Sequence, residues 1–315
     1  MEATPITEFL KSPLTGRTNI LLETTLDCQK IIQAYQQDYG DAIALAPYFS
    51  DLDQVKIYRC LDTGYRFYYP FELAADSDFY ARLQTSGSYY SLRLEHQIAT
   101  QFFRPSESVL EIGCGIGLFL QQLQQKGLIC TGLELNQQAV QTACAQGLHV
   151  INQEIGEHAE NHAESYDIVC FFQVLEHIPQ VRPFIQAALA VLKPGGKLIV
   201  GVPNNNPFLF EHDCYHALNL PPHHMGLWDT QSLTSLQDVF NLQLDHLLVE
   251  PLQFQDYDHY FRLQAEHLAA QSWFLGQISK FVWLQLRPTR IRLWLQAVMG
   301  RSREGRNLLA VYTKT

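Results

Sequence analysis

A glycine-rich turn between Val109 and Gly117 carries the clearest chemical signal of the chain. The run VLEIGCGIG begins like a buried strand and then places glycines at 113, 115 and 117, just before a helical pattern. Such a turn lets a nucleotide-like ligand approach the backbone, and we expect it to offer free amide N–H groups at a helix N-terminus. Glu111 adds a carboxylate beside the turn, where a cationic group of the ligand could bind.

The spacing of these glycines separates two classes of cofactor. Dinucleotide-binding enzymes use G-x-G-x-x-G, whereas this chain has G-x-G-x-G. About 20 residues downstream, Glu134 ends the second expected strand, where a carboxylate can accept hydrogen bonds from ribose hydroxyls. Leu135 beside it offers an apolar face for a purine ring. The pattern favours a nucleoside cofactor other than NAD.

The candidates for acid–base chemistry are histidines that follow the fourth and fifth expected strands. The loop from Asn204 to Trp228 is long and rich in Asn, His and aromatic residues, which is typical of a substrate-binding loop. Histidine titrates near neutral pH and suits a general base. The candidates are His177, His216, His223 and His224. For any one of them, an ordinary hydrogen-bonded pocket or loop histidine is the commoner explanation.

These residues are positioned by strands and helices that alternate regularly. We expect strands at 108–114, 129–135, 149–155, 166–174, 197–203, 242–249 and 307–312, and helices at 118–126, 137–146, 181–192 and 230–240. This alternation predicts an α/β fold with a doubly wound, parallel, seven-stranded sheet covered by helices on both faces. Gln173 and Glu176 follow the fourth strand, where such sheets open their ligand crevice.

Several motifs in this order resemble those of class I S-adenosylmethionine-dependent methyltransferases. They are E-x-G-x-G-x-G, the acidic end of the second strand, YDIVCFFQVLEHIP and LKPGGKLIVGVPN. The resemblance covers 89–254 and resumes at Asn307, and is closest to the branch of ubiquinone-type O-methyltransferases and sugar C-methyltransferases. It implies a Rossmann-like fold, S-adenosylmethionine as cofactor, and methyl transfer to a small molecule such as a sugar, polyketide or quinone-like acceptor.

The resemblance also assigns roles to individual residues. For the cofactor it implies Glu111 at the methionine amino group, with Glu134 at the ribose and Leu135 at the adenine. The backbone of Gly113, Cys114, Gly115 and Gly117 is expected to run along the cofactor. Glu154 or Ile155 is expected at the adenine edge, and Gln173 and Glu176 in the crevice. The PPHH sequence is expected on the acceptor side. His224 and His223 are therefore favoured for catalysis, with His177 as an alternative base beside the cofactor.

The first 72 residues look like a small separate module. Ser12-Pro-Leu-Thr15-Gly16 and Cys60-Leu-Asp-Thr63-Gly64 have the form of the zinc-ribbon knuckle CxxCG, but only Cys60 keeps a thiol. Hydroxyls are poor zinc ligands. We therefore expect a degenerate zinc-ribbon-like module stabilised by aromatic packing, and no metal site in the chain. The alternative is that both fragments are ordinary turns.

The remaining chain divides around the expected sheet. We expect a helical lead-in at 73–105, the methyltransferase domain at 106–253 and 306–315, and a helical, basic insertion at 254–305. From Lys280 to Arg306 seven residues are basic and only Glu304 is acidic. A solvated helix face is the commoner explanation, but the segment could also bind an anionic partner or a membrane surface.

Composition limits the function classes. A net charge of −10 argues against a nucleic-acid binder. The seven cysteines stand singly, and no run of about 18 apolar residues appears, so we expect a cytoplasmic protein with reduced thiols. Two alternatives to a methyltransferase are an NAD-dependent oxidoreductase and a non-catalytic cofactor-binding protein that docks an anionic partner through the basic insertion. Neither the acceptor atom nor the oligomeric state is indicated.

Overall fold

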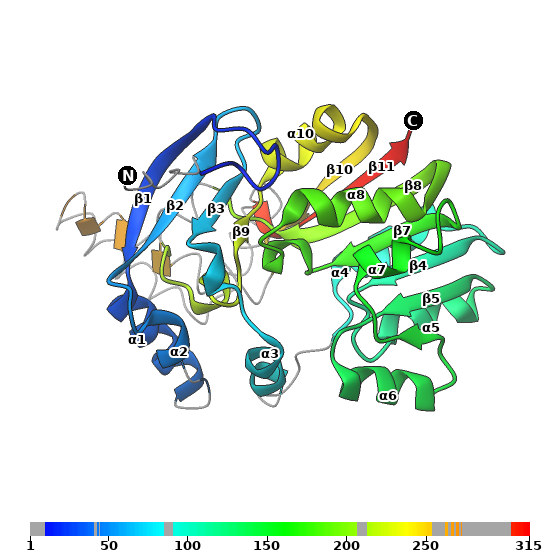
Figure 1. Cartoon of the computed structure of the whole chain (residues 1–315), viewed down its shortest axis with the longest axis horizontal. Helices are drawn as coiled ribbons and strands as arrows, with labels where there is room; N and C mark the ends of the chain where they lie inside the picture. The colour runs from blue at the N-terminus through cyan, green and yellow to red at the C-terminus, as the bar shows by residue number, and fades with distance from the viewer. Residues whose placement is uncertain are drawn as a thin grey trace, which may run out of the picture.

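The computed structural model describes residues 10–40, 45–84, 91–206, 213–253 and 304–315, with isolated residues at 43 and between 262 and 272. The described residues form two β-sheets that lie side by side in Figure 1, a four-stranded sheet near the N-terminus and a larger sheet of seven strands. No helix in these parts of the chain is both long and apolar enough to cross a bilayer.

The larger sheet has the strand order β10-β11-β8-β7-β4-β5-β6. Its strands are β4 (Ser108–Ile112), β5 (Ile129–Leu133), β6 (Val150–Ile151), β7 (Tyr166–Phe172), β8 (Leu192–Pro203), β10 (Leu242–Pro251) and β11 (Glu304–Lys314). The predicted seven-stranded α/β sheet is confirmed. The expectation that all strands are parallel is wrong for β11, which runs antiparallel to β8 and β10. Glu304 pairs with Pro251, so the chain re-enters the sheet at the edge where β10 leaves it.

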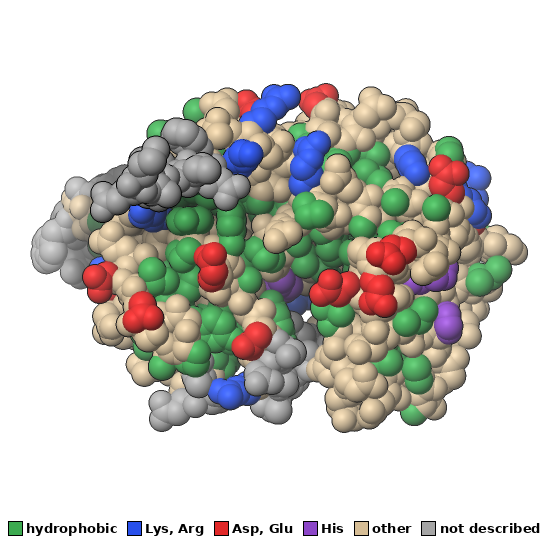
Figure 2. All heavy atoms as spheres, viewed as in Figure 1, with side chains coloured by type: hydrophobic (Ala, Val, Ile, Leu, Met, Phe, Trp, Pro, Cys, Tyr) green, Lys and Arg blue, Asp and Glu red, His purple; other side chains and the backbone are tan. Residues whose placement is uncertain are grey.

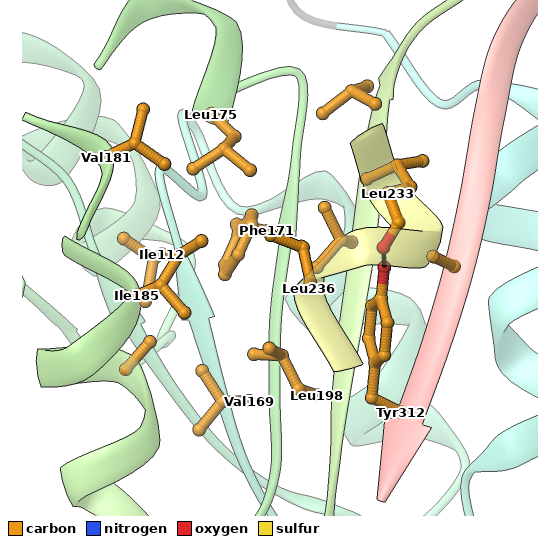
Figure 3. Packing of buried hydrophobic residues seen from close by; sticks show 14 of the residues in the cluster. Ile112, Val169, Phe171, Leu175, Val181, Ile185, Leu198, Leu233, Leu236 and Tyr312 are labelled. Atoms are coloured by element: carbon orange, nitrogen blue, oxygen red, sulfur yellow. Dashed lines mark hydrogen bonds between the residues drawn. The ribbon is translucent and has the colours of Figure 1, made fainter. Parts of the chain in front are cut away.

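Helices cover both faces of this sheet, as the doubly wound prediction requires. One face packs against α7 (Ile155–Ala159), α8 (Val181–Val191) and α10 (Thr230–Phe240). The opposite face packs against α4 (Leu94–Ala99), α5 (Leu118–Gln125) and α6 (Gln137–Ala145). Figure 3 shows the first core, in which the Tyr312 hydroxyl of β11 donates a 2.7 Å hydrogen bond to the Leu233 carbonyl of α10.

Local sequence explains where these elements begin and end. The β7 sequence YDIVCFF is almost wholly apolar, as expected of a central strand buried on both faces. Helix α10 starts at a capping box, in which the Asp229 carboxylate accepts a hydrogen bond from the Ser232 amide at 2.8 Å. It ends at Asn241, which adopts a left-handed conformation with φ 53°.

Two expected elements are corrected by the structure. The single lead-in helix is divided into α3 (Ser77–Gln84) and α4, which continues into the 3₁₀ turn η3 (Thr100–Phe102). Arg93 is extended, with φ −109° and ψ 172°, and its amide donates to His96 Nδ1 at 3.1 Å, so helix α4 cannot begin earlier. The third strand is also shorter than expected, because Ile155 already belongs to α7.

The smaller sheet has the order β1-β2-β3-β9. Its strands are β1 (Ile20–Asp27), β2 (Gln54–Cys60), β3 (Arg66–Tyr69) and β9 (Gly226–Leu227), with α1 (Cys28–Tyr39), α2 (Ala46–Phe49) and the 3₁₀ turn η2 (Phe71–Leu73) beside them. The predicted hairpin is present as β2 and β3. Strand β9 comes from the expected acceptor loop and pairs with β3, so this loop completes the sheet of the N-terminal module.

The four knuckle positions of the N-terminal module lie together. The Thr15 hydroxyl is 3.8 Å from Cys60 Sγ. Burial raises the pKa of the Cys60 thiol, but hydrogen bonds from Ser12, Thr63 and Thr15 outweigh burial and lower it. The zinc-ribbon ancestry and the domain boundaries stay predictions. The basic insertion lies almost entirely outside the described residues, as do six residues of the acceptor loop, 207–212.

Gly117 gives a stability prediction for the glycine turn. Its φ is +79°, and a Cβ there would lie 2.4 Å from Leu148 Cδ1, whereas Gly127 has a similar φ of +81° with nothing within 4 Å. We expect Gly117→Ala to lower the free energy of unfolding by about 2–4 kcal/mol, from backbone strain and overpacking, and Gly127→Ala by about 1 kcal/mol, from strain alone. Urea denaturation measures both variants, and equal losses would contradict the steric argument.

Candidate functional site

The glycine turn connects β4 to α5 and binds the end of the neighbouring strand. Gly113 has φ +73°, and a Cβ there would lie 2.5 Å from Val174 Cγ2. The amides of Gly113 and Cys114 donate to the Leu133 carbonyl at 2.8 and 3.1 Å, and the amide of Gly115 donates to Glu134 Oε2 at 2.8 Å. The expectation of free amides is therefore wrong for these three residues, because the end of β5 lies close enough to accept their hydrogen bonds.

Glu111 is a buried carboxyl group directly before the turn. It is only 4% exposed, and its Oε2 atom has no hydrogen-bond partner in the part of the chain that the structure describes. Burial, and secondly the charge of Glu134, raise the pKa of Glu111 to about 8. A cationic group that entered beside it would stabilise its ionised form.

The end of β5 carries the predicted carboxylate and apolar side chain. Glu134 accepts hydrogen bonds from the amides of Gly115 and Asn136, both at 2.8 Å. Leu135 is 61% exposed. The side-chain amide of Asn152, which the sequence analysis did not single out, donates to the carbonyls of Glu134 and Leu135 at 2.8 Å each. Asn152 therefore fixes the backbone that presents both side chains.

A cavity of about 440 Å³ lies between the carboxyl ends of the large sheet and the N-terminal module. Figure 2 shows a hollow between the two halves of the molecule, with a histidine side chain visible inside it. Of the predicted site residues the cavity wall includes Glu111, Gly113, Cys114, Gly115, Gln173, Glu176, His177, His223 and His224. The wall does not include Gly117, Glu134, Leu135, Glu154 and Ile155. Glu154 is exposed at the N-cap of α7, and Ile155 is buried.

Gln173 organises one side of the cavity. It has φ 55°, and its side-chain Nε2 donates to Glu95 Oε1 at 3.1 Å and to Asn307 Oδ1 at 3.3 Å. The Arg93 guanidinium donates to the Gln173 side-chain oxygen at 3.4 Å. Arg93 and Asn307 also line the cavity. Sequence reasoning missed both, since Arg93 was assigned to a helix and Asn307 to the start of a strand.

Three histidines gather in the wall of the same cavity. His177 lies in the 3₁₀ turn η4 (Leu175–His177). The centroid of its ring is 4.6 Å from that of His223 and 4.9 Å from that of His224. The rings of His223 and His224 stack on each other with their centroids 4.5 Å apart. Burial lowers the pKa of His177 to about 4, and it lowers the pKa values of His223 and His224 well below their usual range. All three imidazoles are therefore neutral at pH 7.

Glu176 lies against this histidine cluster. Its side chain is fully buried, and Oε1 is 3.9 Å from His177 Nε2. Within the described ranges, neither carboxyl oxygen has a hydrogen-bond partner. Burial raises the pKa of Glu176 to about 8. The Glu176 carbonyl accepts a 2.7 Å hydrogen bond from the Met225 amide, which ties η4 to the run that carries His223 and His224.

The small sheet holds residues 221–228, which include His223 and His224, in place. Every residue from 221 to 228 is buried. The Trp228 amide donates to Asn205 Oδ1 at 3.1 Å, and the Trp228 ring lies 4.4 Å from the ring of Tyr65. Arg66 on β3 donates to the Asn205 carbonyl. The part of the cavity wall that carries His223 and His224 is thus built by both sheets together.

Comparisons with known proteins agree with this geometry. A family profile described as a methyltransferase domain matches residues 86–277. The ubiquinone biosynthesis O-methyltransferases of Cronobacter sakazakii and Salmonella arizonae are 32% and 31% identical over 106 residues, which is 32% of this chain and 44% of theirs. The chain thus spans less than half the length of these relatives. A SAM-dependent methyltransferase from Archaeoglobus fulgidus has a similar fold, with a TM-score of 0.51 at 14% identity, covering 76% of this chain and all of that one.

These comparisons bear on the alternatives left open above. The matched profile covers the glycine turn, Glu134 and the histidine cluster, and it describes methyl transfer rather than hydride transfer. The resemblance noted from the motifs is confirmed, and the NAD-dependent oxidoreductase is not supported.

Proposed function

The chain belongs to the methyltransferase domain family, in its class I form, and we propose that it moves a methyl group from S-adenosylmethionine to a small-molecule acceptor. One observation carries the proposal: a single cavity wall contains both the cofactor-type turn with Glu111 and the histidine cluster. Methyl transfer needs a donor and an acceptor aligned in one enclosed space. Both ends of such a space are present here.

The cofactor end fits S-adenosylmethionine on the chemistry of its residues. Glu111 offers a buried, unpartnered carboxyl oxygen for the amino group of the methionine part. Glu134 and the exposed Leu135 stand at the neighbouring strand end for the ribose and the adenine. When bound, the sulfonium of the cofactor supplies an activated methyl group. The residues of the chain hold the donor and exclude water from the cavity.

The proposed acceptor end of the cavity carries the side chains of His177, His223 and His224. A cavity of about 440 Å³ is within the range that binds small molecules. His223 Nε2 and His224 Nδ1 are buried without a partner, so an acceptor hydroxyl could bind there. The distant similarity to ubiquinone biosynthesis O-methyltransferases supports a hydroxyl-bearing, quinone-like acceptor over a sugar or a polyketide.

Calorimetry with S-adenosylmethionine tests the proposal first. Transfer of an isotope-labelled methyl group to a panel of catechols, hydroquinones and sugars then tests catalysis. Absence of cofactor binding would overturn the proposal. Binding without transfer to any acceptor would instead favour a non-catalytic cofactor-binding protein.

Glu134→Ala tests the assignment of the cofactor end. The substitution removes the expected ribose contact and the hydrogen-bond acceptor of the Gly115 amide. We expect the dissociation constant of S-adenosylmethionine to rise about 10- to 30-fold, which corresponds to about 1.4–2 kcal/mol. Glu157→Ala, at an exposed carboxylate on α7, is the matched control and should leave the affinity unchanged. A similar affinity for both variants would refute the role of Glu134.

A further inference from the structure

We propose that His177, His223 and His224 form a binding site for a divalent transition-metal ion, with zinc as the best chemical fit. The sequence analysis expected no metal site, and the structure gives reasons to revise that view. The existence of the site does not depend on the reaction. The role given to it below rests on the proposed function.

The three side chains converge closely enough to share one ion. Each offers one ring nitrogen, and these atoms all lie within 4.8 Å of one another. Zinc–nitrogen bonds of about 2.0–2.1 Å place tetrahedral ligand nitrogens about 3.4 Å apart, so each nitrogen would need to move by about 1 Å. The rings of His223 and His224, which are stacked with 26° between their planes, would also need to turn so that both lone pairs face the ion. Among the residues that the structure describes, no other group of three or more such side chains converges in this way.

Backbone carbonyls already fix the ring nitrogens in a metal-binding form. His177 Nδ1 is 2.7 Å from the His223 carbonyl, and His223 Nδ1 is 3.1 Å from the Leu218 carbonyl. A carbonyl oxygen only accepts, so both Nδ1 atoms carry the proton and both Nε2 atoms keep a lone pair. Metal-binding histidines are typically oriented by such a hydrogen bond from the other ring nitrogen.

The polar atoms around the cluster are unsatisfied without an ion. His223 Nε2, His224 Nδ1 and both carboxyl oxygens of Glu176 are buried and have no hydrogen-bond partner among the described residues. Leaving such groups unpaired is costly, and a proton acceptor for catalysis would need only one of them. A divalent cation satisfies the imidazole lone pairs together, and the Glu176 carboxylate offsets the repulsion between the ion and Arg93.

Three neutral imidazoles suit zinc and leave coordination positions open, as catalytic zinc sites do. Glu176 is placed to act as a fourth ligand or as a counter-charge. An acceptor hydroxyl that bound at an open position would release its proton to solvent at a lower pH than when free. The ion would thus prepare an oxygen nucleophile at the acceptor end of the cavity.

Metal content and cobalt substitution test the site without reference to activity. Tag-free protein, reconstituted with Zn²⁺ and dialysed, is expected to hold close to one equivalent by mass spectrometry of the metal. The Co²⁺ form should show visible d–d absorption and proton NMR signals from three shifted, exchangeable imidazole N–H groups. Retention of less than a tenth of an equivalent, or fewer than three such signals, would overturn the proposal.

A pair of variants adds a matched comparison. His223→Ala is expected to lower the retained zinc at least tenfold, while His162→Ala, which removes one ring of the separate stacked pair His158 and His162, should leave it unchanged. Equal retention in the two variants would refute the site. If His223→Ala fails to fold, the signal count in the cobalt form of the unmodified chain decides.

Measuring cofactor binding together with zinc content distinguishes a failure of the metal site from a failure of the proposed function. Zinc at one equivalent in a protein that does not bind S-adenosylmethionine would keep the metal site and refute the methyltransferase. Methyl transfer by metal-free protein at an undiminished rate would keep the methyltransferase and refute the role of the ion.

Discussion

Glu111→Gln is expected to weaken the binding of S-adenosylhomocysteine by about 100-fold, or about 2.7 kcal/mol, because a buried carboxylate that pairs with the amino group is lost. The demethylated cofactor is the right probe, since it keeps that amino group and transfers nothing. Glutamine has nearly the same shape, so the cavity wall is preserved. Titration calorimetry on both proteins measures the difference, and Glu157→Gln on the exposed face of α7 is the control.

The pH dependence of the cofactor affinity tests the same assignment independently. The pKa of Glu111 is raised to about 8 by burial, so the free protein holds this proton at pH 6 and 7. Cofactor binding must remove it, and the affinity should therefore rise about tenfold per pH unit below 8. Above about pH 8 the amino group of the ligand loses its own proton, and the affinity should fall. Proton release, measured in two buffers of different ionisation enthalpy, should disappear in Glu111→Gln.

The raised pKa of Glu111 also predicts how the stability of the free protein depends on pH. An unfolded Glu111 ionises near 4.5, while the folded one stays protonated up to about 8. The folded state binds more protons across this range, so this group makes folding less favourable as the pH rises from 4.5 to 8. Glu111→Gln should accordingly raise the free energy of unfolding at pH 8 more than at pH 5. An unchanged affinity together with an unchanged pH profile would show that Glu111 does not face the cofactor.

The sheet was predictable because its signals are local. Each central strand is a short apolar run such as the β7 sequence, and each helix is marked by its own period and caps, so the alternation of elements is visible in the sequence. The direction of β11 was not visible, because it depends on where the chain returns after Pro251. The break before α4 was missed for a related reason, since the apolar spacing of 79–103 continues across the extended Arg93.

The contact between the glycine turn and Glu134 was likewise easier to predict than the contact among the histidines. The glycine turn and Glu134 are separated by one strand–turn–helix–strand unit of standard length, so their meeting follows from the fold. The meeting of His177 with His223 depends instead on β9 pairing with the N-terminal sheet and on the hydrogen bond between Glu176 and Met225. Those contacts join segments far apart in the chain. Sequence reasoning could name the histidines but not their mutual distance.

Trp228→Ala is expected to cost about 3–5 kcal/mol of unfolding free energy, the usual range for removing a fully buried tryptophan. Trp228 has no exposed surface and packs on Tyr65 of the N-terminal module, while its amide binds Asn205. Trp228→Phe keeps most of the volume and should cost about 1–2 kcal/mol. Urea denaturation of both variants checks the difference, and equal small losses would mean that the ring does not join the two parts.

The functional consequence of Trp228→Ala should be confined to one end of the cavity. Glu111 lies on β4 of the large sheet and the glycine turn follows this strand directly, so the folded fraction of the variant should bind S-adenosylhomocysteine within about threefold of the unmodified chain. His223 and His224 lie on the same buried run as Trp228, and loosening that run should lower zinc retention and acceptor methylation together. Loss of cofactor affinity with the acceptor end intact would be the opposite result. It would show that the N-terminal module supports the large sheet rather than the histidine cluster.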